Sequence, residues 1–184
     1  MNAHLDFYLS ARDSWLQSFQ LMAAANEKVL MPEKWPAKVS ITTEPGVPQL
    51  SLTFQSSFEE HPVEEWVNNV MIATFGVFSM AAVSALDNQF KADRLIDPEL
   101  SRRSLRCIWY MIRCAFAHPT AGIPTWNCKG DYAKPFTLRD SFTLDGLTLN
   151  NIPFSIDQLG GWHHVYELLR QTNEILGIEQ NPKK

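Results

Sequence analysis

The chain has 184 residues, of which 45% are hydrophobic and 20% are charged, and its formal net charge is -4. This length fits a single domain over residues 1–184 with a substantial core, and this composition excludes a disordered or fibrous protein. The acidic balance excludes a protein that coats nucleic acid indiscriminately, but it leaves room for a local basic site.

The N-terminal part of the chain predicts a helix, a β-hairpin and a second helix. Apolar residues at near-helical spacing predict a core helix over Leu5–Val29. Alternating runs on both sides of Pro45 and Gly46 predict a hairpin insertion over residues 38–56. The second helix opens at Pro62.

That second helix carries an uncharged stretch, Val67–Leu86, which is long enough to span a membrane. Its many small residues and the absence of a basic flank favour a buried helix instead, so we predict no membrane partner. Gly76 is one of the small residues that would let another helix approach closely. The helix that follows Asp97 is the natural neighbour.

The stretch from Asp97 to Pro119 predicts the central helix of the fold. Asp97 is a good N-cap and Pro98 suits the first helical position, while Pro119 should end the helix at His118. Apolar side chains cover most of the circumference, which is typical of a helix buried on most sides. One seam is basic and aromatic, and its members are Arg102, Arg103, Arg106, Trp109, Tyr110 and Arg113. A partner that carries phosphate is one explanation for this seam.

The chain after Pro119 is rich in turn-forming residues and predicts a second hairpin. Asp145 and Gly146 form a two-residue turn signal between two short apolar runs. We therefore expect a hairpin insertion within residues 133–152.

The C-terminal part predicts a last helix. Ser155 and Gln158 have the spacing of a capping box, and Gly177 is a suitable C-terminal cap. We expect a frayed tail over residues 179–184. Together these elements predict a mainly helical fold with small β-hairpin additions.

The cysteines and the N-terminus indicate the compartment. The three cysteines are Cys107, Cys114 and Cys128. Their odd number, without a cysteine-rich framework, favours buried thiols in a reducing compartment over a disulfide. The first residues lack a basic region followed by an apolar core, so they do not resemble a secretory signal. We expect a cytoplasmic protein.

The segment IRCAFAHP, from Ile112 to Pro119, resembles the R-x4-6-H motif of the HEPN superfamily, with Arg113, four intervening residues and His118. In that superfamily the motif closes a late helix of an up-and-down helical bundle, and an Ala-Phe pair commonly precedes the histidine. The resemblance therefore implies a HEPN-like bundle. It also implies a metal-independent endoribonuclease without a cofactor, whose cleft is formed by two copies of the chain in a homodimer.

The resemblance assigns the catalytic roles to Arg113 and His118. Cleavage of RNA through its own 2′-hydroxyl needs a proton acceptor, a proton donor and a cation on the phosphate. His118 would move the protons and Arg113 would hold the phosphate. The other members of the seam, Arg102, Arg103, Arg106, Trp109 and Tyr110, would bind the RNA. A toxin or defence effector with an antitoxin protein as partner would fit this activity.

Two features of the motif keep other interpretations open. Residues five apart on an ideal helix lie about 140° from each other, so Arg113 and His118 would meet only through unwinding at Pro119 or across a dimer. Cys114 stands after the arginine, where ribonucleolytic members often carry a polar residue. The alternative function is a catalytically inactive HEPN-like module that binds RNA, a nucleotide or a protein. A purely structural oligomerisation domain is a third interpretation, in which Arg113 is a solvated arginine and His118 is a helix cap.

Two further groups of residues are candidate sites. His163 and Glu167 have a spacing typical of metal ligands, but no third ligand is evident, so we predict a solvated helix start and no metal. Trp126, Tyr132 and Phe136 are able to stack on unpaired bases, although packing in a loop and a sheet is favoured.

Overall fold

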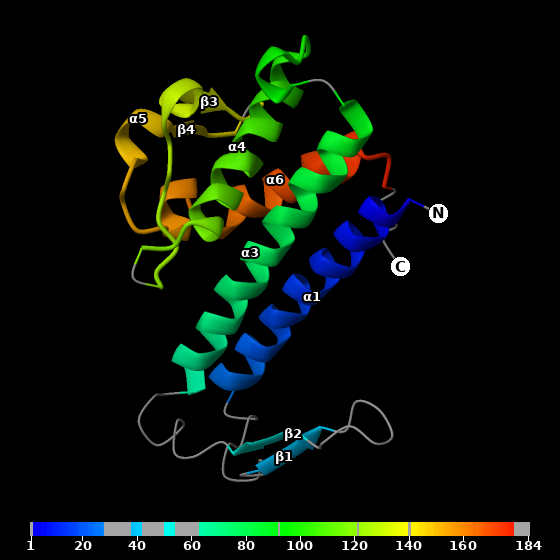
Figure 1. Cartoon of the computed structure of the whole chain (residues 1–184), viewed down its shortest axis with the longest axis vertical. Helices are drawn as coiled ribbons and strands as arrows, with labels where there is room; N and C mark the ends of the chain where they lie inside the picture. The colour runs from blue at the N-terminus through cyan, green and yellow to red at the C-terminus, as the bar shows by residue number, and fades with distance from the viewer. Residues whose placement is uncertain are drawn as a thin grey trace. The chain divides into compact units, whose positions relative to one another are not determined.

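The computed structural model describes residues 2–27, 38–41, 50–53, 63–91, 93–120, 122–139 and 141–178. The fold is mainly helical with two small antiparallel sheets, as the sequence predicts (Figure 1). The chain divides into two compact units, one formed by residues 13–74 and the other by residues 1–12 and 75–184. A single domain over residues 1–184 stays a prediction.

Two long helices run from one unit into the other. Helix α1 spans Ala3–Asn26 and helix α3 spans Val63–Phe90. The prediction of a first helix over Leu5–Val29 is confirmed as far as the structure describes it, because Val29 and Pro62 lie outside the described residues.

The first predicted hairpin is present in the unit of residues 13–74. Strand β1 (Lys38–Ile41) pairs antiparallel with strand β2 (Leu50–Thr53), and Val39 lies opposite Leu52. The predicted turn at Pro45 and Gly46 lies outside the described residues.

Helix α3 is the most apolar element of the fold. Within the described chain, its segment Glu65–Phe90 is the one helix long and apolar enough to cross a membrane by these two measures. Core helices of soluble proteins meet the same criteria, and 56% of its most apolar window is buried inside the protein. The absence of a membrane partner stays a prediction.

Helix α4 (Leu100–Ala117) begins two residues later than predicted. Its N-cap is Glu99, whose carboxylate accepts hydrogen bonds from the backbone N–H groups of Ser101 (3.0 Å) and Arg102 (2.8 Å). The prediction of Asp97 as N-cap is wrong, because Asp97 ends the preceding 3-10 helix η2 (Arg94–Ile96) and its carboxylate binds arginine side chains instead.

The prediction that α4 is central is confirmed. It packs against α6 (Trp162–Ile175), β3 (Pro135–Thr137) and η2. Its Trp109 ring is fully buried, lies 5.1 Å from the Phe78 ring, and donates a hydrogen bond of 2.8 Å from Nε1 to the hydroxyl of Thr172. At the other end, an ideal Cβ on Gly76 of α3 would lie 2.5 Å from the Phe116 ring, so the two helices approach as closely as expected.

The second hairpin is present, but its turn lies elsewhere. Strand β3 pairs antiparallel with β4 (Thr143–Asp145), so the chain reverses between residues 138 and 142. The predicted turn at Asp145 and Gly146 is wrong, because Asp145 instead caps the short helix α5 (Gly146–Leu149) by accepting a hydrogen bond of 3.0 Å from Leu147 N–H.

The capping box is confirmed, although it caps a different element. Ser155 and Gln158 cap the 3-10 helix η4 (Ile156–Leu159), and α6 starts only after Gly160 and Gly161. Gly177 adopts a left-handed φ of 69°, as a C-terminal glycine cap requires. The predicted frayed tail, residues 179–184, lies outside the described residues.

Candidate functional site

Two arginines of the predicted basic seam are bound to a buried carboxylate. Arg102 donates to Asp97 from Nη2 (2.6 Å) and Nε, and Arg106 donates from Nη1 (2.8 Å). Asp97 and Arg106 are only 1% and 2% exposed, and Arg106 also pairs with Asp87 at 3.0 Å. The hydrogen bonds from Arg102 and Arg106 lower the pKa of Asp97 to about 2. These arginines therefore hold the start of α4 in place.

The predicted seam is consequently not one exposed surface. Arg106 and Trp109 lie in the interior, and Arg102 covers the Phe90 ring with its guanidinium 4.4 Å from the ring centroid. The prediction of one exposed seam is wrong, because the sequence spacing fixes which residues share a helix face but does not show what covers that face. Neither Arg106 nor Trp109 presents a side chain to a ligand in this structure.

The remaining members of the seam, Arg103, Tyr110 and Arg113, are partly exposed. The structure adds residues from outside α4 to them. Arg94 stacks 4.1 Å from the Tyr110 ring centroid and donates a hydrogen bond of 3.2 Å to the Tyr132 hydroxyl.

We call this surface the basic aromatic face, and its members are Arg94, Arg103, Tyr110, Arg113, Tyr132 and Lys134. The Tyr110 and Tyr132 rings are 4.7 Å apart, and the guanidinium of Arg113 lies 5.8 Å from the Tyr110 ring centroid.

Several cations lie within electrostatic range of the Cys107 thiol. Burial raises the pKa of this thiol to about 11, while the charges of Arg94, Lys134, Arg106 and Arg103 act in the opposite direction. The sequence offered no local signal for Arg94 or Lys134, because only the tertiary fold brings η2 and the loop before β3 to this side of α4.

The Tyr110 hydroxyl is tied to Cys114, the residue that follows Arg113 in the motif. A hydrogen bond with Cys114 raises the pKa of Tyr110, and Cys114 is only 7% exposed. Cys114 therefore has a packing role beneath the face. All three cysteines are buried free thiols, as predicted.

The two motif residues occupy different positions at the end of α4. Arg113 lies in the helix beside Tyr110, whereas His118 is the exposed C-cap residue with φ -130° and ψ 61°. Within the part of the chain that the structure describes, no hydrogen bond or ion pair joins them. In one chain the two motif residues are therefore not linked directly.

The other candidate residues serve mainly in packing. Trp126 is buried and donates a hydrogen bond of 2.6 Å to Gln158, and Phe136 is 5% exposed. His163 is exposed, and the Glu167 carboxylate accepts hydrogen bonds from Arg170. Among the residues that the structure describes, no group of three His, Cys, Asp or Glu side chains is arranged to hold a metal ion.

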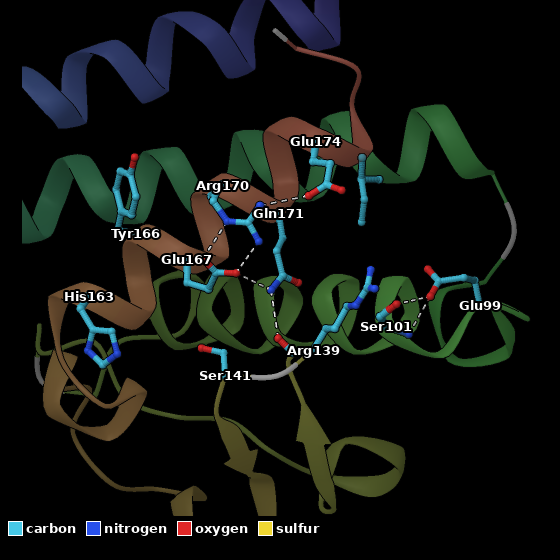
Figure 2. A pocket seen from close by; sticks show the side chains of 11 residues that line it. Glu99, Ser101, Arg139, Ser141, His163, Tyr166, Glu167, Arg170, Gln171 and Glu174 are labelled. Atoms are coloured by element: carbon cyan, nitrogen blue, oxygen red, sulfur yellow. Dashed lines mark hydrogen bonds and ion pairs between the residues drawn. The ribbon is translucent and has the colours of Figure 1, made fainter. Parts of the chain in front are cut away.

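A pocket of about 840 Å³ lies away from the motif, between α6, the start of α4 and the turn that follows β3 (Figure 2). Neither Arg113 nor His118 lines it. The sequence had pointed to this place only through His163 and Glu167, as a weak metal site.

No protein-family model matches the chain, and searches of curated proteins and of solved structures find no match. The likeness to the HEPN superfamily therefore rests on the motif of Arg113 and His118 and its position on α4.

Proposed function

We propose that this protein is a metal-independent endoribonuclease of the HEPN type that cleaves RNA by attack of the 2′-hydroxyl. The observation that carries the proposal is the exposed His118, which ends the buried helix that also carries Arg103, Tyr110 and Arg113. A cytoplasmic location and a toxin or defence role with an antitoxin partner are further predictions that depend on this activity.

The basic aromatic face supplies what RNA binding needs. Arg94, Arg102 and Arg106 are paired with carboxylates, but Arg103 and Arg113 stay partly exposed, and Lys134 is exposed. Cations of this kind pair with phosphate groups, and Arg does so through two parallel hydrogen bonds. A local basic surface in an acidic chain favours a few specific phosphate contacts over general coating.

The position of His118 suits proton transfer. His118 is exposed to solvent at the end of α4, and an imidazole is able to accept and to donate protons near neutral pH. In this proposal Arg113 steadies the phosphate. Because Arg113 and His118 do not meet in one chain, a second copy supplies the other half of the cleft, and its histidine acts as the base.

The alternative function is an RNA-binding module without turnover, and the burial of Cys114 favours it. Ribonucleolytic members of the superfamily often have a polar residue in this position, whereas here the side chain packs under Tyr110. The same basic aromatic face would bind RNA in both cases.

Incubation with single-stranded RNA in the presence of a chelator tests the proposal. We expect cyclic-phosphate products, and we expect a loss of at least about 100-fold in rate for Arg113→Ala and His118→Ala. His163→Ala is the matched control, because His163 is also an exposed histidine but lies on α6. Circular dichroism should show that all three variants are folded.

Unchanged cleavage by His118→Ala would refute the catalytic assignment. RNA binding without cleavage by the wild type would favour the module instead. Arg103→Ala should weaken RNA binding in either case, and Arg139→Ala, an exposed arginine outside the face, should not.

A further inference from the structure

Most of the residues that line the pocket beside α6 are polar or charged, although apolar atoms also contribute to its walls. The polar face of α6 contributes Tyr166, Glu167 and Glu174, and the other wall includes Glu99 and Arg139. Figure 2 shows these side chains along α6, at the start of α4 and at the turn after β3. Three carboxylates and two guanidinium groups line it, so its charged groups sum to a negative value when His163 is neutral.

The guanidinium of Arg170 is bound to two carboxylates of the same helix. It donates to Glu167 from Nε (2.8 Å) and Nη2 (2.7 Å), and to Glu174 from Nη1 (3.2 Å). The hydrogen bond from Arg170 lowers the pKa of Glu167 to about 2, so this carboxylate stays ionised at neutral pH. The charge of Arg170 is therefore compensated by Glu167 and Glu174.

The amide of Gln171 forms the floor of the pocket, and this residue is only 7% exposed. Its Nε2 donates to the Glu167 carboxylate (2.8 Å) and to the backbone carbonyl of Arg139 (3.2 Å), as Figure 2 shows. Two acceptors on the nitrogen side fix the orientation of the amide. Within the described residues, the Gln171 Oε1 atom accepts no hydrogen bond.

The Gln171 Oε1 atom has a fixed orientation and receives no hydrogen bond from the described residues. It therefore needs a donor from a ligand or from water. Glu174, whose side chain is 65% exposed, binds Arg170 through one oxygen and has a second oxygen available. The pocket therefore offers two acceptors and a negative charge to any molecule that enters it.

We propose that this pocket binds a small organic cation with several N–H donors, an amine or a guanidinium compound. Its N–H groups donate to Gln171 Oε1 and to the Glu174 carboxylate. The negative charge of the pocket disfavours phosphate and RNA, so this site is separate from the basic aromatic face and does not depend on the nuclease proposal. Arg139, at the edge of the pocket, determines whether cations that also carry a carboxylate bind more tightly than cations that do not.

Isothermal titration of the full-length protein with agmatine and with arginine tests the proposal, and glucose serves as a neutral hydrogen-bonding probe. We expect agmatine or arginine to bind in the pocket, and glucose to give no signal. Tighter binding of arginine would indicate that Arg139 holds its carboxylate, and tighter binding of agmatine would indicate a site for cations without one.

Variants locate the bound cation. Glu174→Gln removes the charge of an exposed side chain without affecting the core, and Gln171→Met removes the amide oxygen that is open to the pocket. We expect each to weaken binding by about tenfold. Asp157→Asn is the matched control, because Asp157 is an exposed acid that does not line the pocket, and its affinity should not change.

Two results would overturn the inference. One is the absence of any binding of agmatine and arginine at millimolar concentration. The other is binding that is unchanged in Glu174→Gln, which would place the cation elsewhere. If thermal melting shows that Gln171→Met is unfolded, the Glu174→Gln result alone decides the question.

Discussion

Asp97 determines how the two nearest arginines of α4 are used. A carboxylate that is 1% exposed would be costly to bury by itself, but Arg102 and Arg106 both donate to it. From the sequence, Asp97 is predicted to be a helix cap, and Arg102 and Arg106 are predicted to be surface cations. Their pairing was not predictable, because it depends on the turn of η2, which folds the carboxylate back onto the helix.

We expect Asp97→Asn to lower the free energy of unfolding by about 3 kcal/mol, because it leaves two guanidinium groups without their buried counter-charge. Urea denaturation followed by circular dichroism measures the change. The control, Asp131→Asn, alters an exposed acid and should stay within about 0.5 kcal/mol of the wild type. A similar loss in both variants would contradict the special role of Asp97.

The same substitution should change how stability depends on pH. The pKa of Asp97 is about 2 in the folded chain, whereas that of an unfolded aspartate is about 4. The stabilisation is therefore present above about pH 4 and is lost as the pH falls from about 4 toward 2. The acid-induced decrease in the free energy of unfolding should be smaller in Asp97→Asn than in the wild type.

At the scale of elements, close packing between α3 and α4 fixes the position of the motif. Gly76 lies against the Phe116 ring, two residues before His118. The sequence indicated this approach, because small residues in an apolar helix let a neighbour come near. It did not indicate the start of α4 or the turn of the second hairpin, since alternative capping residues stand close together at both places.

We expect Gly76→Ala to destabilise the protein by about 1 to 3 kcal/mol, although alanine is the better helix former. The new methyl group would lie 2.5 Å from a carbon atom of the Phe116 ring, so the end of α4 must shift. Thermal or urea unfolding measures the loss. Addition of Phe116→Leu should recover part of it, whereas strictly additive effects of the two substitutions would refute the steric explanation.

At the scale of the whole molecule, the proposed cleft needs more than one chain. Arg113 lies within α4 and His118 is its C-cap residue, and within the described residues no interaction joins them. An active site that combines the two therefore depends on association between copies. The proposed nuclease and the alternative RNA-binding module use the same surface, but only the nuclease requires association between copies of the chain.

We expect the rate of RNA cleavage per chain to fall on dilution and to follow the fraction of dimer. Analytical ultracentrifugation at the same concentrations measures that fraction. The binding of agmatine or arginine should not fall in this way, because all residues of the α6 pocket come from one chain. A cleavage rate per chain that is independent of concentration in a monomeric protein would refute the shared cleft.

The sequence by itself determined the main helices, the first hairpin, the burial of the cysteines and the place of His118 at the end of α4. These features follow from local periodicity, from proline and glycine positions and from apolar content, which act over a few residues. Only the tertiary structure decided which arginines of α4 remain at the surface, because Asp97 and Asp87 reach them from other parts of the chain. It also assembled the basic aromatic face and the α6 pocket, whose members are distant in the sequence and meet only through packing.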